Sequence, residues 1–458
     1  MPSTPAEWLP ILTQRLDERQ PRIALNRRYS NGDAPMPEMG RNTKASWFAF
    51  QKKARTDLGG LACASLSGRM VPNGVRVGGS SDGASIEAAR RVWRDNRLDV
   101  VFADAIWEML SVSVGYLITG VREGDPIITS EKAEQVITAG DPAQPWRARA
   151  ALKAWRDLDE ERDYALVWVP GVRQRFSRSS KTATGTLYGT SYGEEWREDG
   201  LPETYDGPVP VFALDNFNGV AEFEPHIDVI DRINLGKLQR LVVTAMQAFK
   251  QRAMKGGLPQ TDADGNDINW AHVLEPAPGA MWDLPEGIDI WESEAIDIRP
   301  LLEGEKTDAR DFSAVMRVPL DVFVPSGENQ SAEGAANAHK GEIQKAKDRT
   351  ARASAPMEGA IVAALRILGL EDGSTVQVLW QPPEHISFGE KTLAATQAIA
   401  SGLSKRWVAQ NIMGLSPEEI AEEEAEQRRN NVSQLLSTIR PTEPPTAVAE
   451  VAAARGEG

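Results

Sequence analysis

The sequence predicts a mainly helical α+β protein, because two kinds of pattern recur along its 458 residues. Long stretches place apolar residues three and four positions apart, which is the period of an amphipathic helix. Shorter stretches rich in Val, Ile and Thr alternate between apolar and polar residues, as strands do. Clusters of Gly, Pro, Asn and Asp separate these stretches. The length suggests about two to four structural units.

The first half of the chain mixes helices with strands. Apolar spacing predicts helices over residues 6–28, 46–70 and 84–110, and Gly59 and Gly60 weaken the second. Strand patterns occur in VPNGVRVGG, SVSVGYLITGVREGDPIIT, YALVWVPG and PVPVFALD. A polar stretch rich in Gly, Ser and Thr precedes the last of these and predicts a β excursion with long loops.

One long helix is predicted over residues 222–255. Acidic residues and Pro225 mark its start, and the basic Lys250, Arg252 and Lys255 precede two glycines at its end. Its basic positions Arg232, Lys237, Arg240, Lys250 and Arg252 have three readings. They form a solvated face, meet carboxylates of a neighbouring subunit, or contact DNA phosphates in passing.

The remaining sequence predicts more helices around a small excursion. Residues 257–298 are rich in Pro, Gly and Asp, and a helix follows over residues 300–316. Ser331 is a candidate N-cap for a second long helix, which Pro356 is expected to kink. The first arm of this helix is poor in large apolar residues and is expected to face solvent or a lumen, whereas the second is expected to face a core.

The C-terminal part begins with a strand and then returns to helix. VQVLWQPP predicts the strand, and residues 389–438 predict two or three helices. The biased composition of the tail predicts disorder over residues 439–458.

Charge and cysteine content limit the function. The formal net charge is -15, from 66 acidic and 51 basic residues, so the chain is not expected to hold DNA tightly. The single cysteine, Cys63, cannot form an internal disulfide and is expected to be a small core residue. The sequence shows neither a signal peptide nor a membrane span, which predicts a soluble protein made in a reducing compartment.

Motifs that could carry chemistry are weak. Residues 189–193 match G-x-S-x-G around Ser191, but they lack the strand and helix that a nucleophile elbow requires. GEKT at Gly304 and at Gly389 lacks the remainder of a phosphate-binding loop. No pair among the four histidines has metal-ligand spacing, and DADGND departs from a calcium loop. We therefore predict no catalytic site, no cofactor and no metal.

Several stretches, taken in order, resemble portal proteins of long-tailed phages of actinobacteria. LDERQPRIALNRRYSNGDAPMPEMGR and SWFAFQKKARTDLGGLACASLSGRMVPNGVRVGG resemble the opening of that family. FEPHIDVIDRINLGKLQRLVVTAMQAFKQRAMKGG is similar to its stem helix, VPSGENQSAEGAANAHKGEI to its tunnel loop, and KTLAATQAIASGLSKRWVAQNIMGLSPEEI to its crown. The opening match rests on Tyr29, Gly32, Pro35, Pro37, Arg55, Gly74 and Val75.

The resemblance implies a portal fold and a ring, usually a dodecamer, at one capsid vertex. The implied parts are a wing (1–225), a first stem helix (226–256), a clip (257–298), a second stem helix (299–317), a tunnel loop (318–332), a long kinked helix that ends the wing (333–386) and a crown (387–438). The implied channel loop contains Val324, Ser326, Glu328, Asn329, Gln330 and Ser331. Candidate clip docking residues are Trp270, Trp282 and Trp291.

The implied function is passive conduction of double-stranded DNA during packaging and ejection. The expected partners are terminase, the major capsid protein, a head–tail adaptor and a scaffold protein, and no membrane is involved. The chain would assemble in the bacterial host cytoplasm and remain in the virion. Two alternatives stay open at this point, namely another ring-forming head–tail adaptor and a serine hydrolase that uses Ser191.

Overall fold

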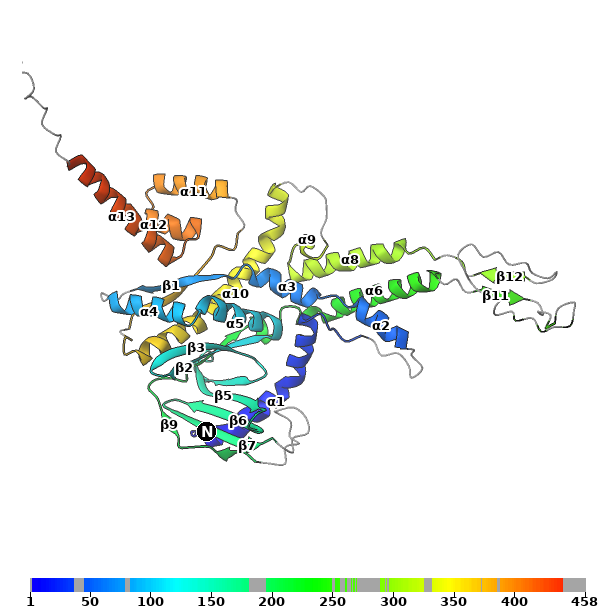
Figure 1. The fold of residues 1–458 in the computed structure, drawn as a ribbon, viewed down its shortest axis with the longest axis horizontal. Helices are drawn as coiled ribbons and strands as arrows, with labels where there is room; N and C mark the ends of the chain where they lie inside the picture. Colours follow the sequence, from blue (N-terminus) through cyan, green and yellow to red (C-terminus); the bar gives the residue numbers. More distant parts are fainter. Residues whose placement is uncertain are drawn as a thin grey trace, which may run out of the picture.

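The computed structural model has a central body with a helix pair projecting from one side and a small helical module on another (Figure 1). It describes residues 2–36, 45–78, 83–180, 195–248, 252–255, 260–261, 265, 267, 269, 289–292, 294, 296–324, 332–371, 373–384 and 388–439. Helices and strands are both abundant in these residues, in agreement with the predicted α+β class.

Helix α1 (Pro5–Ser30) covers one face of the larger sheet. Thr4 caps the helix together with Glu7 in a capping box, which fixes its start close to the predicted position. The sheet is antiparallel in the order β4-β5-β6-β7-β8, and β9 also pairs with β7. Its strands are β4 (Val136–Gly140), β5 (Ala148–Asp157), β6 (Arg162–Val169), β7 (Val172–Ser179), β8 (Arg197–Glu198) and β9 (Glu203–Thr204). The core between helix and sheet includes Trp8, Leu9, Leu12, Leu16, Leu152, Val167 and Phe176.

The predicted helix over residues 46–70 is wrong, because two helices occupy this stretch. They are α2 (Ala45–Ala54) and α3 (Leu58–Ser67), and the Asp57 side chain caps α3 by accepting from the Gly60 N–H. Gly59 and Gly60 lie inside α3 and do not break it. A Cβ at Gly60 would lie 2.4 Å from the Ser30 carbonyl oxygen, so the glycine permits close packing against the end of α1.

The stretch predicted as one helix over residues 84–110 also divides. Helices α4 (Gly83–Asp95) and α5 (Leu98–Val112) are separated at Arg97, which has the left-handed φ of 51°. Asn96 stabilises the turn, since its side chain donates to the Val92 carbonyl and accepts from the Ile128 N–H. This long-range contact ties the break to the neighbouring sheet.

The central core lies between α5, a second sheet and the C-terminal half of α10 (Ala332–Ile367). That sheet has the order β10-β2-β3, formed by β10 (Val211–Asp215), β2 (Val114–Arg122) and β3 (Asp125–Glu131). A further antiparallel pair joins β1 (Pro72–Gly78) to β13 (Thr375–Trp380). Buried members of this core include Cys63, Phe102, Ile106, Leu117, Met357 and Ile361. Cys63 is thus a core residue, as expected.

The projecting pair consists of α6 (Ile227–Ala248) and α8 (Arg299–Met316), which run side by side (Figure 1). Two short 3-10 turns, η1 (Phe217–Gly219) and η2 (Glu224–His226), precede α6.

The predicted helix over residues 222–255 extends too far. Residues Arg252–Lys255 form strand β11, which pairs antiparallel with β12 (Asp289–Glu292). The register places Arg252 opposite Glu292 and Lys255 opposite Asp289. The backbone pairing of β11 with β12 therefore takes the place of the last turn of the predicted helix.

The last third of the chain contains the expected helices. Helix α9 (Leu320–Phe323) precedes α10, which continues through Pro356. The kink at Pro356 stays a prediction, and the candidate N-cap Ser331 lies outside the described residues. The helical module follows as α11 (Phe388–Ala400), α12 (Lys405–Val408), the π-helical turn η3 (Ala409–Met413) and α13 (Pro417–Ile439). Within the described residues, no helix has the length and apolar character that a membrane span requires.

Candidate functional site

The projecting helix pair is joined by a row of ion pairs. Arg232 on α6 lies 2.8 Å from Asp308 and 3.2 Å from Asp311 on α8, measured from guanidinium nitrogen to carboxylate oxygen. Arg240 lies 2.8 Å from Glu305, one turn before Asp308. Because these pairs are partly exposed, each contributes at most about 1 kcal/mol. Their regular spacing nevertheless specifies how the two helices align.

The base of α6 is anchored to the segment between α2 and α3. Lys237 donates a 2.7 Å hydrogen bond to the Thr56 hydroxyl, and burial lowers the pKa of Lys237. The Asn234 side chain accepts from the Thr56 N–H at 3.1 Å. Tyr29 at the end of α1 donates to Asp231 at 2.7 Å. These contacts hold the helix pair firmly against the body.

The predicted basic residues of this helix therefore separate into groups. Arg232 and Arg240 face carboxylates of their own chain, and Lys237 faces Thr56. Lys250 lies outside the described residues, and only the backbone of Arg252 is described, within β11. That any of them lines a channel stays a prediction.

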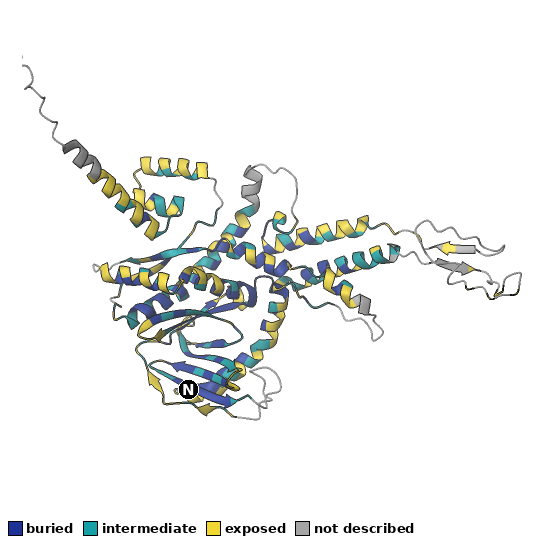
Figure 2. Ribbon diagram, in the orientation of Figure 1, coloured by how far each residue is buried: buried dark blue, intermediate teal, exposed yellow. Residues whose placement is uncertain are grey.

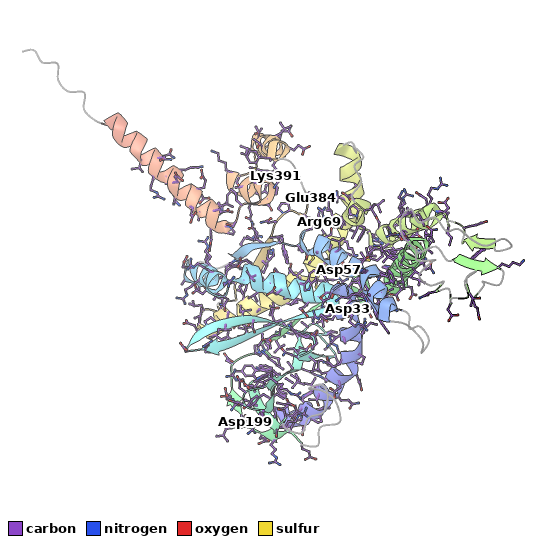
Figure 3. All side chains as sticks on the ribbon, turned by 45° about the vertical axis from the view of Figure 1, so that its right-hand side comes forward. Asp33, Asp57, Arg69, Asp199, Glu384 and Lys391 are labelled. Carbon is purple, nitrogen blue, oxygen red and sulfur yellow. The ribbon has the colours of Figure 1, made fainter. Side chains whose placement is uncertain are left out.

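The N-terminal half of α10 is attached to α3 through a buried carboxylate. Glu342 is fully buried and accepts from the Ser65 hydroxyl and from the Arg69 guanidinium, the latter at 2.6 Å. Arg69 also donates to the Pro383 carbonyl at 2.9 Å and contacts the His339 ring. Figure 3 labels Arg69 and Glu384 close together at this junction. A buried charge of this kind is tolerated only when it is fully paired.

One turn further along α10, Lys345 and Arg349 pair with a second buried carboxylate, Glu222, which lies in the segment before α6. Glu222 lies 2.6 Å from the Lys345 ammonium and 2.5 Å from the Arg349 guanidinium. Burial alone would raise the pKa of Glu222, but Lys345 and Arg349 outweigh it and hold that pKa below its ordinary value. Lys345 also donates to the Met316 carbonyl at the end of α8 at 3.1 Å. This cluster thus connects α10 with both α8 and the segment before α6.

The character of α10 changes at Ala353. From there on its inward side is apolar, with Met357, Ala360 and Ile361 fully buried. The second arm therefore faces a core, as expected. The first arm differs from the expectation of a simple solvent or lumen face. Its outer side is exposed at Lys340 and Gln344, but its inner side buries charges.

The remaining candidate residues are only partly described. Val324 follows α9 and is exposed, and Trp291 on β12 is also exposed. Ser326, Glu328, Asn329, Gln330, Ser331, Trp270, Trp282 and Ser191 lie outside the described residues. Their proposed roles stay predictions.

A hollow of about 1270 Å³ lies between the two sheets and the C-terminal half of α10. Its walls include Ile118, Trp155, Trp168 and Val362, and Lys153 in the wall is paired with Glu131. Among the described residues, no group of three or more His, Cys, Asp and Glu side chains is placed to hold a metal ion. The hollow therefore offers no basis for assigning a reaction.

Sequence reasoning missed the two buried carboxylate clusters. Glu222 and Arg349 are 127 positions apart, so their pairing follows from the fold and not from local pattern. One signal was present, since Glu342, Lys345 and Arg349 follow one another at helical spacing along α10. They continue the line of small and apolar residues that packs into the core.

Comparison with known proteins places the chain in a family. A family model described as "Phage portal protein, SPP1 Gp6-like" matches residues 10–433. A comparison with curated proteins finds no match.

Among solved structures, similar chains occur in the virion of a native gene transfer agent (GTA) particle and in the neck of that particle. The virion chain has 14% identity and a TM-score of 0.43, with 87% of this chain and 99% of that chain covered. The neck chain has 14% identity and a TM-score of 0.44, with 86% and 99% covered.

Proposed function

The chain belongs to the phage portal protein family, SPP1 Gp6-like, and from this membership we propose that its copies form a ring-shaped channel for DNA in a virus particle. The match over residues 10–433 carries this proposal. That family is structural and not enzymatic, so the prediction that the chain is not an enzyme is confirmed. Membership of this family favours a portal over the two alternatives, another ring-forming head–tail adaptor and a serine hydrolase that uses Ser191.

The parts of the ring subunit follow the order of elements. The body up to residue 225, with the C-terminal half of α10, is the wing. Helices α6 and α8 are the stem, and the β11–β12 hairpin belongs to the clip at its far end (Figure 1). The segment that contains α9 leads into the tunnel loop, and α11 to α13 are the crown. This assignment is supported by two adjacent helices that carry a small hairpin beyond their ends.

The charge of the chain suits passage of DNA without retention. Tight binding to phosphates requires an excess of Lys and Arg, whereas this chain has a formal net charge of -15. Arg232 and Arg240 are already neutralised by carboxylates of α8. The ring would therefore conduct DNA passively, and a terminase motor would supply the energy from ATP.

Terminase would dock at the clip during packaging, and head–tail connector proteins would dock there afterwards. The exposed Trp291 on β12 suits such a contact, since aromatic side chains are enriched in protein interfaces. The wing would contact the major capsid protein at one vertex, and a scaffold protein would assist assembly in the host cytoplasm. We expect the ring to be a dodecamer.

Electron microscopy of the purified full-length chain tests this function. We expect rings with a central opening, and mass measurement should give one dominant closed assembly. A matched sample in which Arg240 and Arg232 are both replaced by Glu should lose the α6–α8 ion pairs and give fewer rings. Only monomers or small oligomers of the unmodified chain at every concentration would refute the proposal.

A further inference from the structure

Strand β10 is an edge strand whose outer side is open. It pairs with β2 on its inner side, and the Thr119 N–H donates to the Pro210 carbonyl at the start of this pairing. Because hydrogen-bonded pairs alternate in an antiparallel ladder, the even-numbered residues of β10 exchange hydrogen bonds with β2. The backbone N–H and C=O groups of Val211, Ala213 and Asp215 therefore point away from β2. They make no hydrogen bond in the described part of the chain.

Two other edge strands are capped by side chains. On β3, the Asn96 side chain accepts from the Ile128 N–H and donates to the Pro126 carbonyl. On β13, the Glu358 carboxylate accepts from the Val378 N–H at 3.2 Å. Proteins cover or block sheet edges in this way because an uncovered edge recruits further strands. Strand β10 has no such cap among the described residues, so an extended peptide can pair with it.

The open side of β10 borders the hollow between the two sheets and α10. Val211, Ala213 and Asp215 all line that hollow. Its volume of about 1270 Å³ exceeds the roughly 300–1,000 Å³ of typical small-molecule sites, which favours a polypeptide as its occupant. Figure 2 shows the strands around it as mostly buried or intermediate. A strand added there would therefore be sheltered from water.

The two faces of β10 meet different walls of the hollow. Phe212 lies against α10, where a Cβ on Gly359 would come within 2.8 Å of its ring. Val211 belongs to the same apolar cluster as Trp168 of the larger sheet. A strand added beside β10 would therefore point alternate side chains at α10 and at the larger sheet. Both walls offer apolar side chains, such as Val362 on α10, so the added segment should be apolar on both faces.

The charges of the hollow favour a basic residue in that segment. Four of the five cations in its walls have a carboxylate partner, in the pairs Lys153–Glu131, Arg173–Glu203, Arg352–Asp348 and Arg366–Glu371. The fifth, Arg147, is exposed in the β4–β5 turn. Asp206 precedes β10 and Asp215 ends it, and neither forms an ion pair in the described part of the chain. A Lys or Arg at one end of the added segment would pair with one of these carboxylates.

We propose that an extended segment of another protein adds to β10 as a fourth strand of the β10-β2-β3 sheet. The segment is apolar on both faces and carries Lys or Arg at one end. The occupant is another protein and not a second copy, because every strand in the described part of the chain already pairs within its own chain. The contact lies within the body of one subunit, so it goes beyond the proposed channel and does not depend on ring formation.

A random-sequence peptide library displayed on yeast, selected against the full-length chain, tests this contact. The enriched peptides should contain a run of Val, Ile, Leu or Phe with Lys or Arg near one end. Synthetic peptides of the enriched sequences, added to the chain, should slow amide hydrogen exchange at Val211, Ala213 and Asp215, because these three N–H groups point to the open side. A peptide that binds elsewhere would leave their exchange unchanged.

Two pairs of variants connect peptide binding to the open side of β10. Ala355→Arg places a charge in the α10 wall of the hollow at an exposed position, and should weaken binding at least about tenfold. Ala351→Arg, one turn earlier on α10, is exposed outside the hollow and should bind like the parent. Ala213→Pro removes an outward N–H while leaving the ladder with β2, as prolines in edge strands do, and should also weaken binding. Ala213→Ser keeps the N–H and is its control. If Ala213→Pro fails to fold, Ala355→Arg decides the test alone.

The outcomes separate this contact from the proposed function. If the selection yields no binder, or if the binders retain their affinity for Ala355→Arg, strand addition at β10 is wrong. If Ala355→Arg instead prevents the chain from associating with itself, the occupant is a second copy and the assignment to another protein is wrong. Ring formation is measured separately by electron microscopy, so a failure of the proposed channel leaves the peptide result intact.

Discussion

Replacing Glu222 by Gln should destabilise the attachment of α10 more than any surface substitution. The variant keeps the shape of the side chain but removes the charge that compensates Lys345 and Arg349. Both cations are largely buried, with side-chain exposures of 12% and 9%. Removing one partner from a buried ion pair costs about 3–5 kcal/mol.

For Glu222→Gln we expect a free-energy cost at the lower end of that range. Arg349 keeps Asp348 as a second partner, and Lys345 keeps its hydrogen bond to the Met316 carbonyl. A loss of about 3 kcal/mol corresponds to a roughly 150-fold increase in local opening. Amide hydrogen exchange of residues 342–353 on α10, measured at neutral pH, reports this opening directly.

One control variant and a pH series distinguish the loss of the Glu222 charge from a general loss of stability. Glu303→Gln removes an exposed ion pair with Lys306 and should change stability by less than about 0.5 kcal/mol. The pKa of Glu222 is lowered in the fold, so its contribution is present above the ordinary carboxyl pKa and is lost as pH falls through the lowered value. The difference between variant and parent should therefore shrink in acid. Unchanged exchange on α10 at neutral pH would refute the reasoning.

Three further predictions concern other parts of the chain. Burial raises the pKa of Asp17 to about 6, so the folded protein loses stability as pH rises from about 4 to 6. Asp17→Asn should stabilise it by about 1–2 kcal/mol at pH 8, and not at pH 4, in urea unfolding. Gly60→Ala should cost about 2–4 kcal/mol through its clash with the Ser30 carbonyl, whereas Gly304→Ala, with open space around it in α8, should stabilise by about 0.5–1 kcal/mol in the same assay. Duplex DNA should bind the purified chain with a Kd weaker than about 10 µM at 0.15 M salt in gel-shift experiments, and tight retention would contradict passive conduction.

Elements with a strong local pattern were predicted closely. Helix α1 is an example, because its apolar spacing and its capping box at Thr4 act within a few residues of each other. The strands β2, β3, β6, β10 and β13 were identified for the same reason, since alternation and turn residues lie next to one another. Assignment to the portal family depended instead on the order of several weak stretches, and the family match confirms it.

Errors arose where distant contacts decide the local structure. The predicted helix over residues 222–255 was too long because basic residues near its end are typical of a helix C-terminus. In the structure Arg252 and Lys255 lie on β11, which pairs with a strand 34 or more positions further along the chain. The break at Arg97 depends in part on Asn96 reaching the backbone of Ile128. The buried carboxylates Glu222 and Glu342 escaped notice for the same reason. Charged residues normally predict a solvated face, and only the fold shows which of them are enclosed.

Helix α1 has a consequence for the order in which the chain folds. Its residues Trp8, Leu12 and Leu16 are buried against strands that extend as far as Phe176. During synthesis the helix is made before these strands, and the surface that covers it is finished about 160 residues later. At about 5–20 residues per second, its apolar side remains uncovered for roughly 10–30 s. The newly made helix α1 is therefore a binding segment for a chaperone, and aggregation risk is greatest in the interval before β7 emerges.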